Sequence, residues 1–286
     1  MKIVSNQMVF YLLKNLEYSF WKHSKNSLKS NQKYKNIHKG ETCYILGNGG
    51  SLKYFDLSVL SNLVTMGCTY SLVDKRLEES GLNYCVFPSA YLMSPLWKNR
   101  VTGKIQFNSL KPIFKKIIKD NKKTQFFISL TDKYSFLRPP SNINFVYHFG
   151  NKNSNTYDIS GKFSIVTGGL DFMLGIAKYL GFSRVVLIGC DYLGFPSMDR
   201  HFYSNNKPIL GNYKDDYIKR ISKVAKNLEL DVLTIFPEGI NSPDFESKSF
   251  TEYFGVDENY HNQSEIIDDS YLRLLKKADS KIQLYL

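Results

Sequence analysis

Hydrophobic and polar residues alternate along this chain in blocks that predict strands separated by helices. Short runs rich in β-branched and aromatic residues predict strands at residues 42–46, 63–69, 82–87, 125–130, 143–148, 184–189 and 231–235. Apolar residues spaced three and four positions apart predict helices at residues 54–61, 110–120, 169–180, 213–228 and 264–278. This alternation predicts an α/β fold with a Rossmann-like, mostly parallel sheet and helices on both of its faces.

The two ends of the chain have a different character from its middle. Residues 7–22 carry an apolar, aromatic stripe with lysines around it, which predicts a basic amphipathic helix that lies either on a membrane surface or against protein. Residues 24–40 are rich in Lys and Asn and predict a linker. We therefore expect three parts: an N-terminal segment at residues 1–40, a main domain at 41–245 with candidate lid segments near 88–123 and 194–211, and a helical C-terminal extension at 246–286.

Composition adds a strong positive charge. The chain has 286 residues, 43% of them hydrophobic, and a formal net charge of +12. Eight lysines lie within residues 1–40, and nine Lys and Arg within 98–123. Such blocks attract phosphates, acidic lipids or acidic glycans, or simply form a solvated face. The four cysteines lie in apolar runs without metal-ligand spacing, so we expect buried, reduced thiols in a cytoplasmic protein, with neither a membrane span nor a signal peptide.

The most informative motif follows the first strand of the main domain. That strand ends in the sequence Gly47-Asn48-Gly49-Gly50-Ser51-Leu52-Lys53. A strand that ends in glycines and short polar residues is typical of α/β proteins that bind a phosphate-bearing ligand with backbone N–H groups. Leu52 stands where the dinucleotide fingerprint needs glycine, and the P-loop sequence is absent. The loop predicts a nucleotide ligand held neither as NAD nor as ATP usually is, with a plain strand-to-helix turn as the alternative.

Two further strand and helix ends offer candidate ligand contacts. Thr167 and Gly168 precede the helix predicted at 169–180, and Gly169 begins it; free N–H groups at such a helix start favour an anion. A capping threonine with closely packed glycines is the alternative. Asp191 and Tyr192 follow the strand predicted at 184–189. Ligands bind at the carboxyl ends of such strands, so Asp191 either contacts the ligand or holds the adjacent loop.

His201 is the candidate general base. It lies in the loop 194–211 among Arg200, Tyr203 and Lys207, shortly after a strand-end acid. Histidine is the commonest general base near neutral pH, although a single loop histidine often has no catalytic role. His148, at the end of a predicted strand, is a weaker candidate. The sequence contains no Asp-x-Asp pair and no His-Glu-x-x-His motif, so we expect no metal site and no cofactor.

In this order, the motifs at 47–53, 166–169, 189–192 and 201–203 resemble the bacterial sialyltransferase family of Campylobacter and Haemophilus. They also resemble polysaccharide proteins related to the 6-hydroxymethylpterin pyrophosphokinase-like family. The first resemblance implies a GT-A-type fold and a metal-independent, inverting transfer of sialic acid or a related acidic sugar from a CMP donor to a surface oligosaccharide or glycolipid. It also implies a role in lipopolysaccharide or capsule synthesis by a cytoplasmic protein held peripherally at the inner membrane.

The resemblance also implies a role for each candidate residue. His201 would be the base, and Tyr192 and Tyr203 would meet the leaving phosphate, with Arg200 or Lys207 as helpers. Asp191 is a further candidate for the catalytic centre, because it follows the strand predicted at 184–189. The donor-binding residues would be Asn48, Gly49, Thr167, Gly168 and Gly169, to which the glycine loop itself adds Gly47, Gly50 and Ser51 as candidates. The chain departs from the family pattern with Gly168 in place of serine, Ile165 in place of arginine and Thr69 in place of asparagine, which leaves the identity of the acidic sugar open.

Two other functions remain compatible with the sequence. One is an ATP- and magnesium-dependent phosphotransferase of the pyrophosphokinase type, which needs clustered acids near its site; here only Asp191 and Asp199 are close together. The other is a non-enzymatic basic protein that binds membranes or nucleic acid; no RNA-binding module is evident, so we expect no nucleic-acid partner. A homo-oligomer is also left open.

Overall fold

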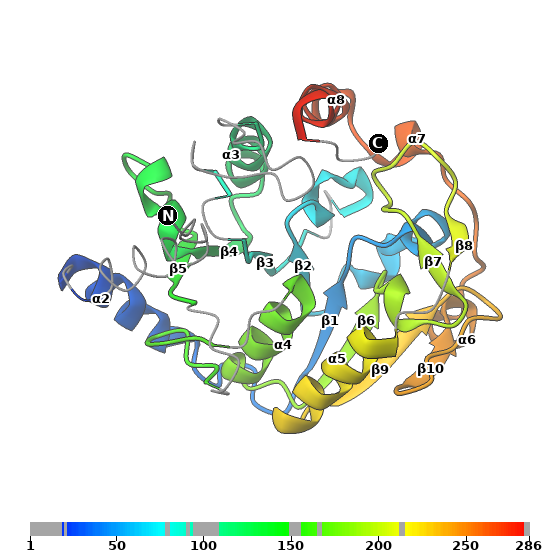
Figure 1. Cartoon of the computed structure of the whole chain (residues 1–286), viewed down its shortest axis with the longest axis horizontal. Helices are drawn as coiled ribbons and strands as arrows, with labels where there is room; N and C mark the ends of the chain where they lie inside the picture. The colour runs from blue at the N-terminus through cyan, green and yellow to red at the C-terminus, as the bar shows by residue number, and fades with distance from the viewer. Residues whose placement is uncertain are drawn as a thin grey trace, which may run out of the picture.

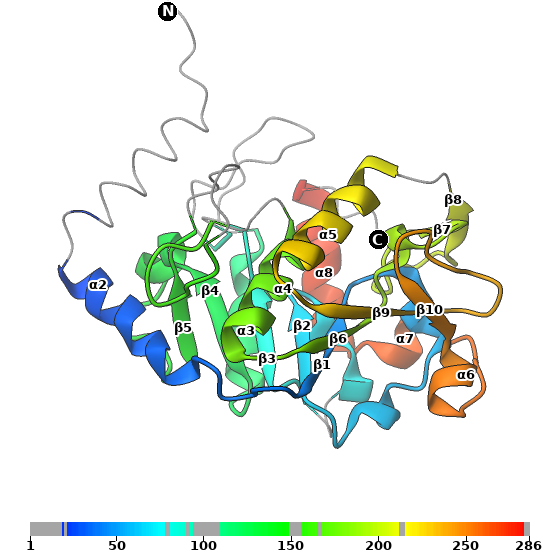
Figure 2. The ribbon, with the colours of Figure 1, turned by 90° about the horizontal axis from the view of Figure 1, so that it is seen from below.

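The computed structural model describes Ser19 and residues 22–77, 81–89, 92–93, 109–148, 156–164, 168–211 and 215–282. An eight-stranded sheet forms its centre, in the order β10-β9-β6-β1-β2-β3-β4-β5, and every neighbouring pair is parallel. Its strands are β1 (Thr42–Leu46), β2 (Thr65–Cys68), β3 (Tyr84–Phe87), β4 (Gln125–Ser129), β5 (Ile143–Val146), β6 (Arg184–Ile188), β9 (Asp231–Phe236) and β10 (Glu246–Ser249). Figure 2 shows these strands across the molecule, from β5 at one edge to β10 at the other.

Helices cover both faces of the sheet, because alternate strand residues are buried on opposite sides. The cluster that holds Cys43 and Ile45 of β1 includes α4 (Gly169–Leu180) and α5 (Asp215–Asn227). The cluster that holds Leu46 includes α3 (Lys111–Asp120), α6 (Phe250–Phe254), α7 (Gln263–Ile266) and α8 (Asp269–Ile282). Figure 1 shows α4 and α5 on one side of the strands and α3 and α8 on the other. The predicted Rossmann-like α/β class is confirmed.

Strand order locates the point where ligands bind in open α/β sheets. From β1 the chain adds β2 to β5 on one side, and it then returns to place β6 on the other side of β1. The strand order therefore reverses between β1 and β6. In open parallel sheets, ligands bind at the carboxyl ends of the strands beside such a reversal. Here the loops after these two strands begin at Gly47 and Gly189.

Residues 24–40 differ from the linker predicted for them. They continue α2 (Lys22–Lys29) into the short helix Ser30–Tyr34, which packs along the edge strand β5. The Asn31 amide donates hydrogen bonds of 2.8 Å to the carbonyls of Phe145 and Ile159. Leu28, Asn31 and Tyr34 are buried at three-residue spacing, a pattern that the surrounding Lys and Asn residues conceal. The amphipathic helix predicted at residues 7–22 falls almost entirely outside the described residues.

Three other predicted segments also differ in detail. The helix predicted at 54–61 is replaced by two short 3₁₀ helices, Gly50–Tyr54 and Leu57–Leu60. The helix predicted at 264–278 is two helices, α7 and α8, separated at Ile267, which has extended backbone. The C-terminal region is not only helical, since β10 forms an edge of the main sheet against β9. Within the described residues, no helix is both long and apolar enough to cross a bilayer.

The two predicted lid segments have different structures. Within 88–123, residues 90–91 and 94–108 lie outside the described residues, and α3 packs into the core through Ile113, Phe114 and Ile117. The segment 194–211 contains an antiparallel pair, β7 (Ser197–Asp199) and β8 (Ile209–Gly211). The loop between β7 and β8 carries His201 and Tyr203.

Candidate functional site

The glycine loop after β1 packs directly against the loop after β6. The Gly47 N–H donates to the Ile188 carbonyl at 2.8 Å, and the Gly49 N–H donates to the Gly189 carbonyl at 2.8 Å. A Cβ atom on Gly49 would lie 2.6 Å from the Gly189 carbonyl oxygen. That separation is too short for any side chain. Close packing between the two loops therefore requires glycine at this position, independently of any ligand.

Asp191 fixes the end of the same loop. Its side chain is buried. One carboxylate oxygen accepts a hydrogen bond of 2.8 Å from the Ser51 backbone N–H, and the other accepts a short hydrogen bond from the Ser51 hydroxyl. Burial raises the pKa of Asp191 to about 6, although the hydrogen bonds from Ser51 and Gly50 oppose this shift. Of the two roles expected for Asp191, holding the adjacent loop accounts for these contacts.

Asn48 connects the carboxyl ends of β1 and β2. Its side-chain N–H₂ donates to the Thr69 hydroxyl at 3.3 Å, and its side-chain oxygen accepts from the Ser71 hydroxyl at 3.3 Å. Thr69 adopts a left-handed backbone with φ of +44°, which is uncommon for a β-branched residue and is enriched at functional sites. The asparagine of the motif is thus held by its neighbours at the reversal point of the sheet.

The loop that carries His201 is bonded to the glycine loop. The Gly50 N–H donates to the Arg200 carbonyl at 3.1 Å, and the Phe202 N–H donates to the Asn48 carbonyl at 3.1 Å. The same carbonyl lies 3.1 Å from the His201 Nδ1. Because a carbonyl can only accept, Nδ1 carries the proton in this arrangement, and Nε2 is the unprotonated nitrogen of the neutral ring.

The environment of His201 favours that neutral ring. Its side chain is exposed on one side, but enough protein surrounds it that desolvation lowers its pKa, against the opposing effect of the Asn48 hydrogen bond. Its ring stacks on Tyr203, with centroids 4.8 Å apart and an angle of 17° between the planes. A neutral imidazole with an oriented Nδ1–H is the form that a general base requires.

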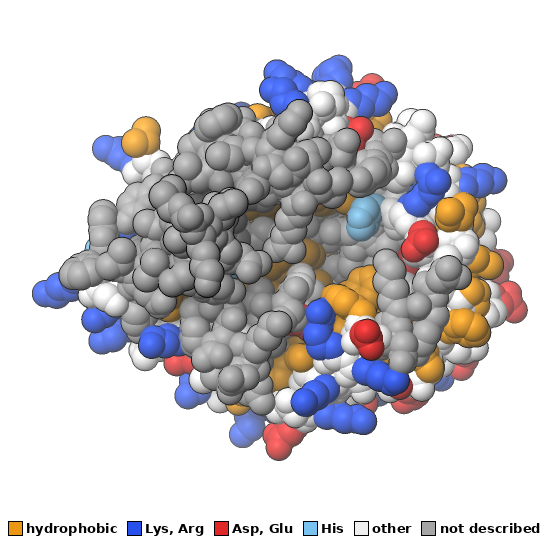
Figure 3. Space-filling view, in the orientation of Figure 1, with side chains coloured by type: hydrophobic (Ala, Val, Ile, Leu, Met, Phe, Trp, Pro, Cys, Tyr) orange, Lys and Arg blue, Asp and Glu red, His pale blue; other side chains and the backbone are white. Residues whose placement is uncertain are grey.

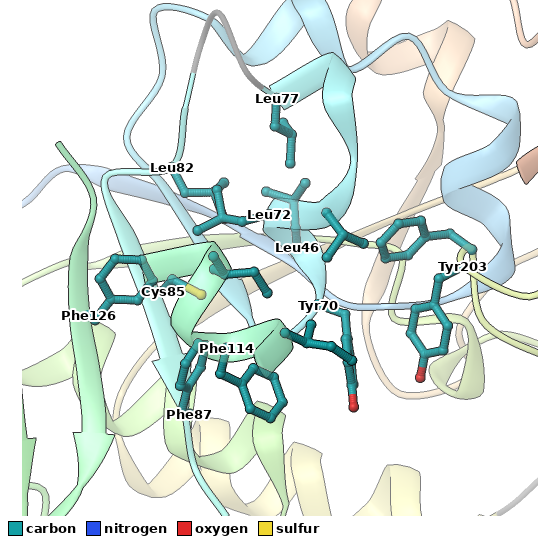
Figure 4. Close-up of a cluster of buried hydrophobic side chains, with 14 of the residues drawn as sticks. Leu46, Tyr70, Leu72, Leu77, Leu82, Cys85, Phe87, Phe114, Phe126 and Tyr203 are labelled. Carbon is teal, nitrogen blue, oxygen red and sulfur yellow. The ribbon is translucent and has the colours of Figure 1, made fainter. Parts of the chain in front are cut away.

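The candidate tyrosines lie in two separate contacts. Tyr203 packs on Tyr70, with ring centroids 4.8 Å apart, whereas Tyr192 packs edge-on against Tyr217 at 4.6 Å. Figure 4 shows the phenol oxygens of Tyr70 and Tyr203 pointing the same way, out of the apolar cluster. Tyr70 was missed in the sequence, although its place directly after β2 puts it at the same sheet edge as Asn48.

The N-terminus of α4 lies at this edge as well. A Cβ atom on Gly169 would lie 3.0 Å from the Cys68 sulfur at the end of β2, and one on Gly168 would lie 3.1 Å from the Tyr217 hydroxyl. Thr167 is outside the described residues. Arg220 of α5, which the sequence analysis did not single out, lies 3.4 Å from the buried carboxylate of Asp171 in the first turn of α4. Because Gly168 and Gly169 have no side chains, Cys68 of β2 and Tyr217 of α5 can lie close to the start of α4.

Lys53, the last residue of the glycine motif, also binds the backbone of the His201 loop. Its side chain is fully buried, and its ammonium donates to the carbonyls of Ser204 at 2.6 Å and Asn206 at 3.0 Å. Gln263 also donates from its side chain to the Tyr203 carbonyl. The seven-residue motif at 47–53 thus contacts the His201 loop on both sides of the histidine, at Arg200 through Gly50 and at Ser204 and Asn206 through Lys53.

Exchange of Lys53 for methionine is expected to change how stability depends on pH. Burial, and secondarily Arg200, lowers the pKa of Lys53 from 10.5 to about 8. Between these two values the unfolded chain binds more protons than the folded one, so this group makes stability rise as pH rises. Denaturant unfolding from pH 7.5 to 10.5 should show a smaller rise for Lys53→Met. The exposed Lys207→Met serves as the control, and equal pH slopes for both variants would contradict the burial of the charge.

Lys and Arg side chains appear around much of the outline in Figure 3, and acidic side chains are fewer. Within the described residues, no group of three or more His, Cys, Asp or Glu side chains is placed to hold a metal ion. All four cysteines are buried free thiols, as predicted. Burial raises the pKa of the Cys68 thiol, next to the α4 N-terminus, to about 11, so it stays protonated and unreactive near neutral pH.

No family model matches this chain, and no curated protein matches it. Solved structures of three Campylobacter jejuni proteins or complexes are similar to it. The sialyltransferase CstII with cytidine-5'-monophosphate has 15% identity and a TM-score of 0.45, covering 84% of this chain and 99% of its own. CstII with a trisaccharide acceptor and CMP has 16% identity and a TM-score of 0.43, with 83% of this chain and 99% of CstII covered. The monofunctional alpha-2,3-sialyltransferase Cst-I has 18% identity and a TM-score of 0.44, with 85% of this chain and 96% of Cst-I covered.

Proposed function

We propose that this protein is a glycosyltransferase that moves an acidic sugar from a CMP donor to a hydroxyl group of an oligosaccharide or glycolipid. The observation that carries the proposal is the position of His201 at the reversal point of the sheet. Its Nδ1 lies 3.1 Å from the carbonyl of Asn48, a residue of the glycine loop. A nucleotide bound beside that loop would present its sugar near the unprotonated Nε2.

In the proposed reaction, His201 acts as the general base. Its Nε2 takes the proton of the acceptor hydroxyl as the acceptor oxygen bonds to the anomeric carbon. The bond from that carbon to the phosphate oxygen breaks on the opposite side, so the configuration inverts and CMP leaves. Protein N–H and O–H groups that point at the departing phosphate lower the energy of the transition state. Backbone N–H groups at Gly168 and Gly169, at the start of α4, are candidates for this role.

The proposal needs no metal ion, because neutral donors and a helix N-terminus would meet the charge of the leaving phosphate. It also keeps the expectations that the sequence raised about place and partner. The basic segment at 7–22 would hold the protein on the cytoplasmic side of the inner membrane, where a lipid-linked acceptor is within reach. The product would belong to lipopolysaccharide or capsule.

Calorimetric titration with CMP tests the proposal directly. We expect CMP to bind, and to bind equally in EDTA, while UDP binds more weakly. Transfer from a CMP-activated acidic sugar to an oligosaccharide acceptor, followed by product mass, then tests the reaction. ATP–magnesium is the comparison ligand. Binding of ATP that requires magnesium, with no response to CMP, would contradict the proposal and favour phosphotransfer.

A further inference from the structure

His201 lies in a tight turn of the loop between β7 and β8, and the Lys53 ammonium is bonded to that turn. The Ser204 N–H donates to the His201 carbonyl at 3.0 Å, which closes the turn. The Ser204 carbonyl accepts a hydrogen bond from the Lys53 ammonium at 2.6 Å. Lys53 is therefore connected to the backbone of the candidate base through a single intervening residue.

The same ammonium also binds a second carbonyl of this loop. It donates to the Asn206 carbonyl at 3.0 Å, two residues beyond Ser204. Gln263 of α7 donates from its side chain to the Tyr203 carbonyl, and Figure 1 shows the chain between β7 and β8 passing close to α7. Both donor side chains are buried. A buried carbonyl that loses its donor is costly, so the path of the loop depends on these two side chains.

Lys53 carries its charge without an acidic partner. Its side chain is fully buried, and within the described chain no carboxylate forms an ion pair with it. Burying an unpaired charge is costly, and an apolar side chain of similar length would fill this site without that cost. The bonds to the two loop carbonyls are the contacts that account for an ammonium group at this position.

The groups that surround this ammonium do not neutralise it. Burial, and secondarily Arg200, lowers the pKa of Lys53 to about 8. The Tyr260 ring lies 6.0 Å from the Lys53 ammonium and 4.8 Å from that of Lys207. His261 is the other titratable group of the segment that packs here, and its N–H donates to the Lys53 carbonyl at 2.7 Å. The Lys53 ammonium therefore loses its charge at a lower pH than an exposed lysine does.

We propose that the charged ammonium of Lys53 positions the turn that carries His201, and that loss of this charge at alkaline pH misaligns the base. The inference deepens the proposed function and rests on it for the role of His201. Lys53 contacts the loop backbone and no reacting atom, so it is a positioning residue. A charged donor forms a hydrogen bond roughly twice as strong as a neutral one, so deprotonation weakens both contacts while the side chain stays in place.

The pH profile of wild-type transfer is the first test. We expect kcat/KM, which reports the free enzyme, to fall on the alkaline side with an apparent pKa near 8. The donor is anionic and would bind beside the loop that ends at Lys53, which favours the charged ammonium. The alkaline fall of kcat should therefore lie at higher pH than that of kcat/KM. Profiles that stay level from pH 7 to 10 would overturn the proposal.

Lys53→Met removes the charge and keeps the length of the side chain. We expect kcat to fall by about 10²-fold, the usual effect of a small misplacement of a catalytic group, with the donor KM close to that of wild type. The alkaline fall should also disappear. Lys39→Met, an exposed change in the turn before β1, is the matched control and should keep the wild-type kcat and profile. A wild-type kcat in Lys53→Met, or an alkaline fall that persists in it, would contradict the positioning role.

Hydrogen exchange of the loop gives a readout that depends neither on the reaction nor on the folding of a variant. In wild type, amide protection at residues 200–208, corrected for the intrinsic exchange rate, should drop as pH rises past about 8, while β6 stays protected. In Lys53→Met the loop should be weakly protected at every pH. If Lys53→Met does not fold, the wild-type series decides.

The same experiment separates this proposal from the proposed function. If loop protection falls with pH as expected but the protein neither binds CMP nor transfers sugar, Lys53 still positions the turn and the proposed function is wrong. If transfer from a CMP donor is found and loop protection does not change between pH 7 and 10, the positioning role of Lys53 is overturned and the proposed function stands.

Discussion

Exchange of His201 for alanine is expected to lower the rate of sugar transfer by about 10²- to 10⁴-fold, the usual contribution of a general base. CMP affinity should stay close to that of wild type, because the His201 ring is part neither of the glycine loop nor of the backbone N–H groups that are proposed to bind the nucleotide. The bonds from Gly50 to Arg200 and from Phe202 to Asn48 use the backbone alone, so the loop should keep its path. Single-turnover transfer and CMP calorimetry measure the two quantities separately.

The pH profile gives a second readout for the same residue. Desolvation lowers the pKa of His201 below 6.5, and the base is active only when neutral. The acidic limb of kcat/KM should therefore fall below pH 6.5, and activity should be level from there toward neutral pH. His23→Ala, an exposed change in α2, is the control. A fully active His201→Ala, or an acidic limb that persists in its residual activity, would remove His201 from the mechanism.

The second large effect is expected at Asp191. Alanine would leave the Ser51 N–H and hydroxyl without their acceptor, and an unpaired buried donor costs about 1–3 kcal/mol. We expect Asp191→Ala to lose about 2–3 kcal/mol of unfolding free energy and to bind CMP at least about tenfold more weakly, since the Ser51 end of the glycine loop loses its acceptor. Urea unfolding and calorimetry measure these losses.

Asp191→Asn separates the shape of this side chain from its charge. The pKa of Asp191 is raised from 3.8 to about 6, so between these values the folded protein binds more protons than the unfolded chain. This group therefore makes stability fall as pH rises through that range. Asp191→Asn should fold, keep most CMP affinity and lose that part of the fall. An unchanged slope from pH 4 to 6 would show that the buried carboxyl is not its source, and wild-type CMP binding by Asp191→Ala would contradict its hold on the loop.

The sequence allowed the sheet to be predicted, because its strands are buried on both faces and appear as apolar runs. The run at 184–189, for example, corresponds to Arg184–Ile188. Strand order was not predictable, since every apolar strand could pair with any other. The edge strand β10 was missed because its sequence, Glu-Ser-Lys-Ser, is polar throughout, as a short edge strand that discourages further pairing often is.

The candidate site was only partly visible in the sequence. Motif order pointed to Asn48 and His201, and the structure brings these two together. Tyr70 could not be found from its sequence neighbours, because its ring packs on Tyr203, which is more than 130 residues away in the sequence. Lys53 looked like an ordinary surface lysine, and only the fold shows that its ammonium is buried against two carbonyls.

The carbonyl of Asn48 accepts hydrogen bonds from both the His201 ring and the Phe202 backbone N–H, so the main chain sets the position of the ring relative to the glycine loop before any ligand arrives. In the proposed reaction the base is therefore oriented in advance. Little conformational entropy is then lost in ordering the histidine when the acceptor binds.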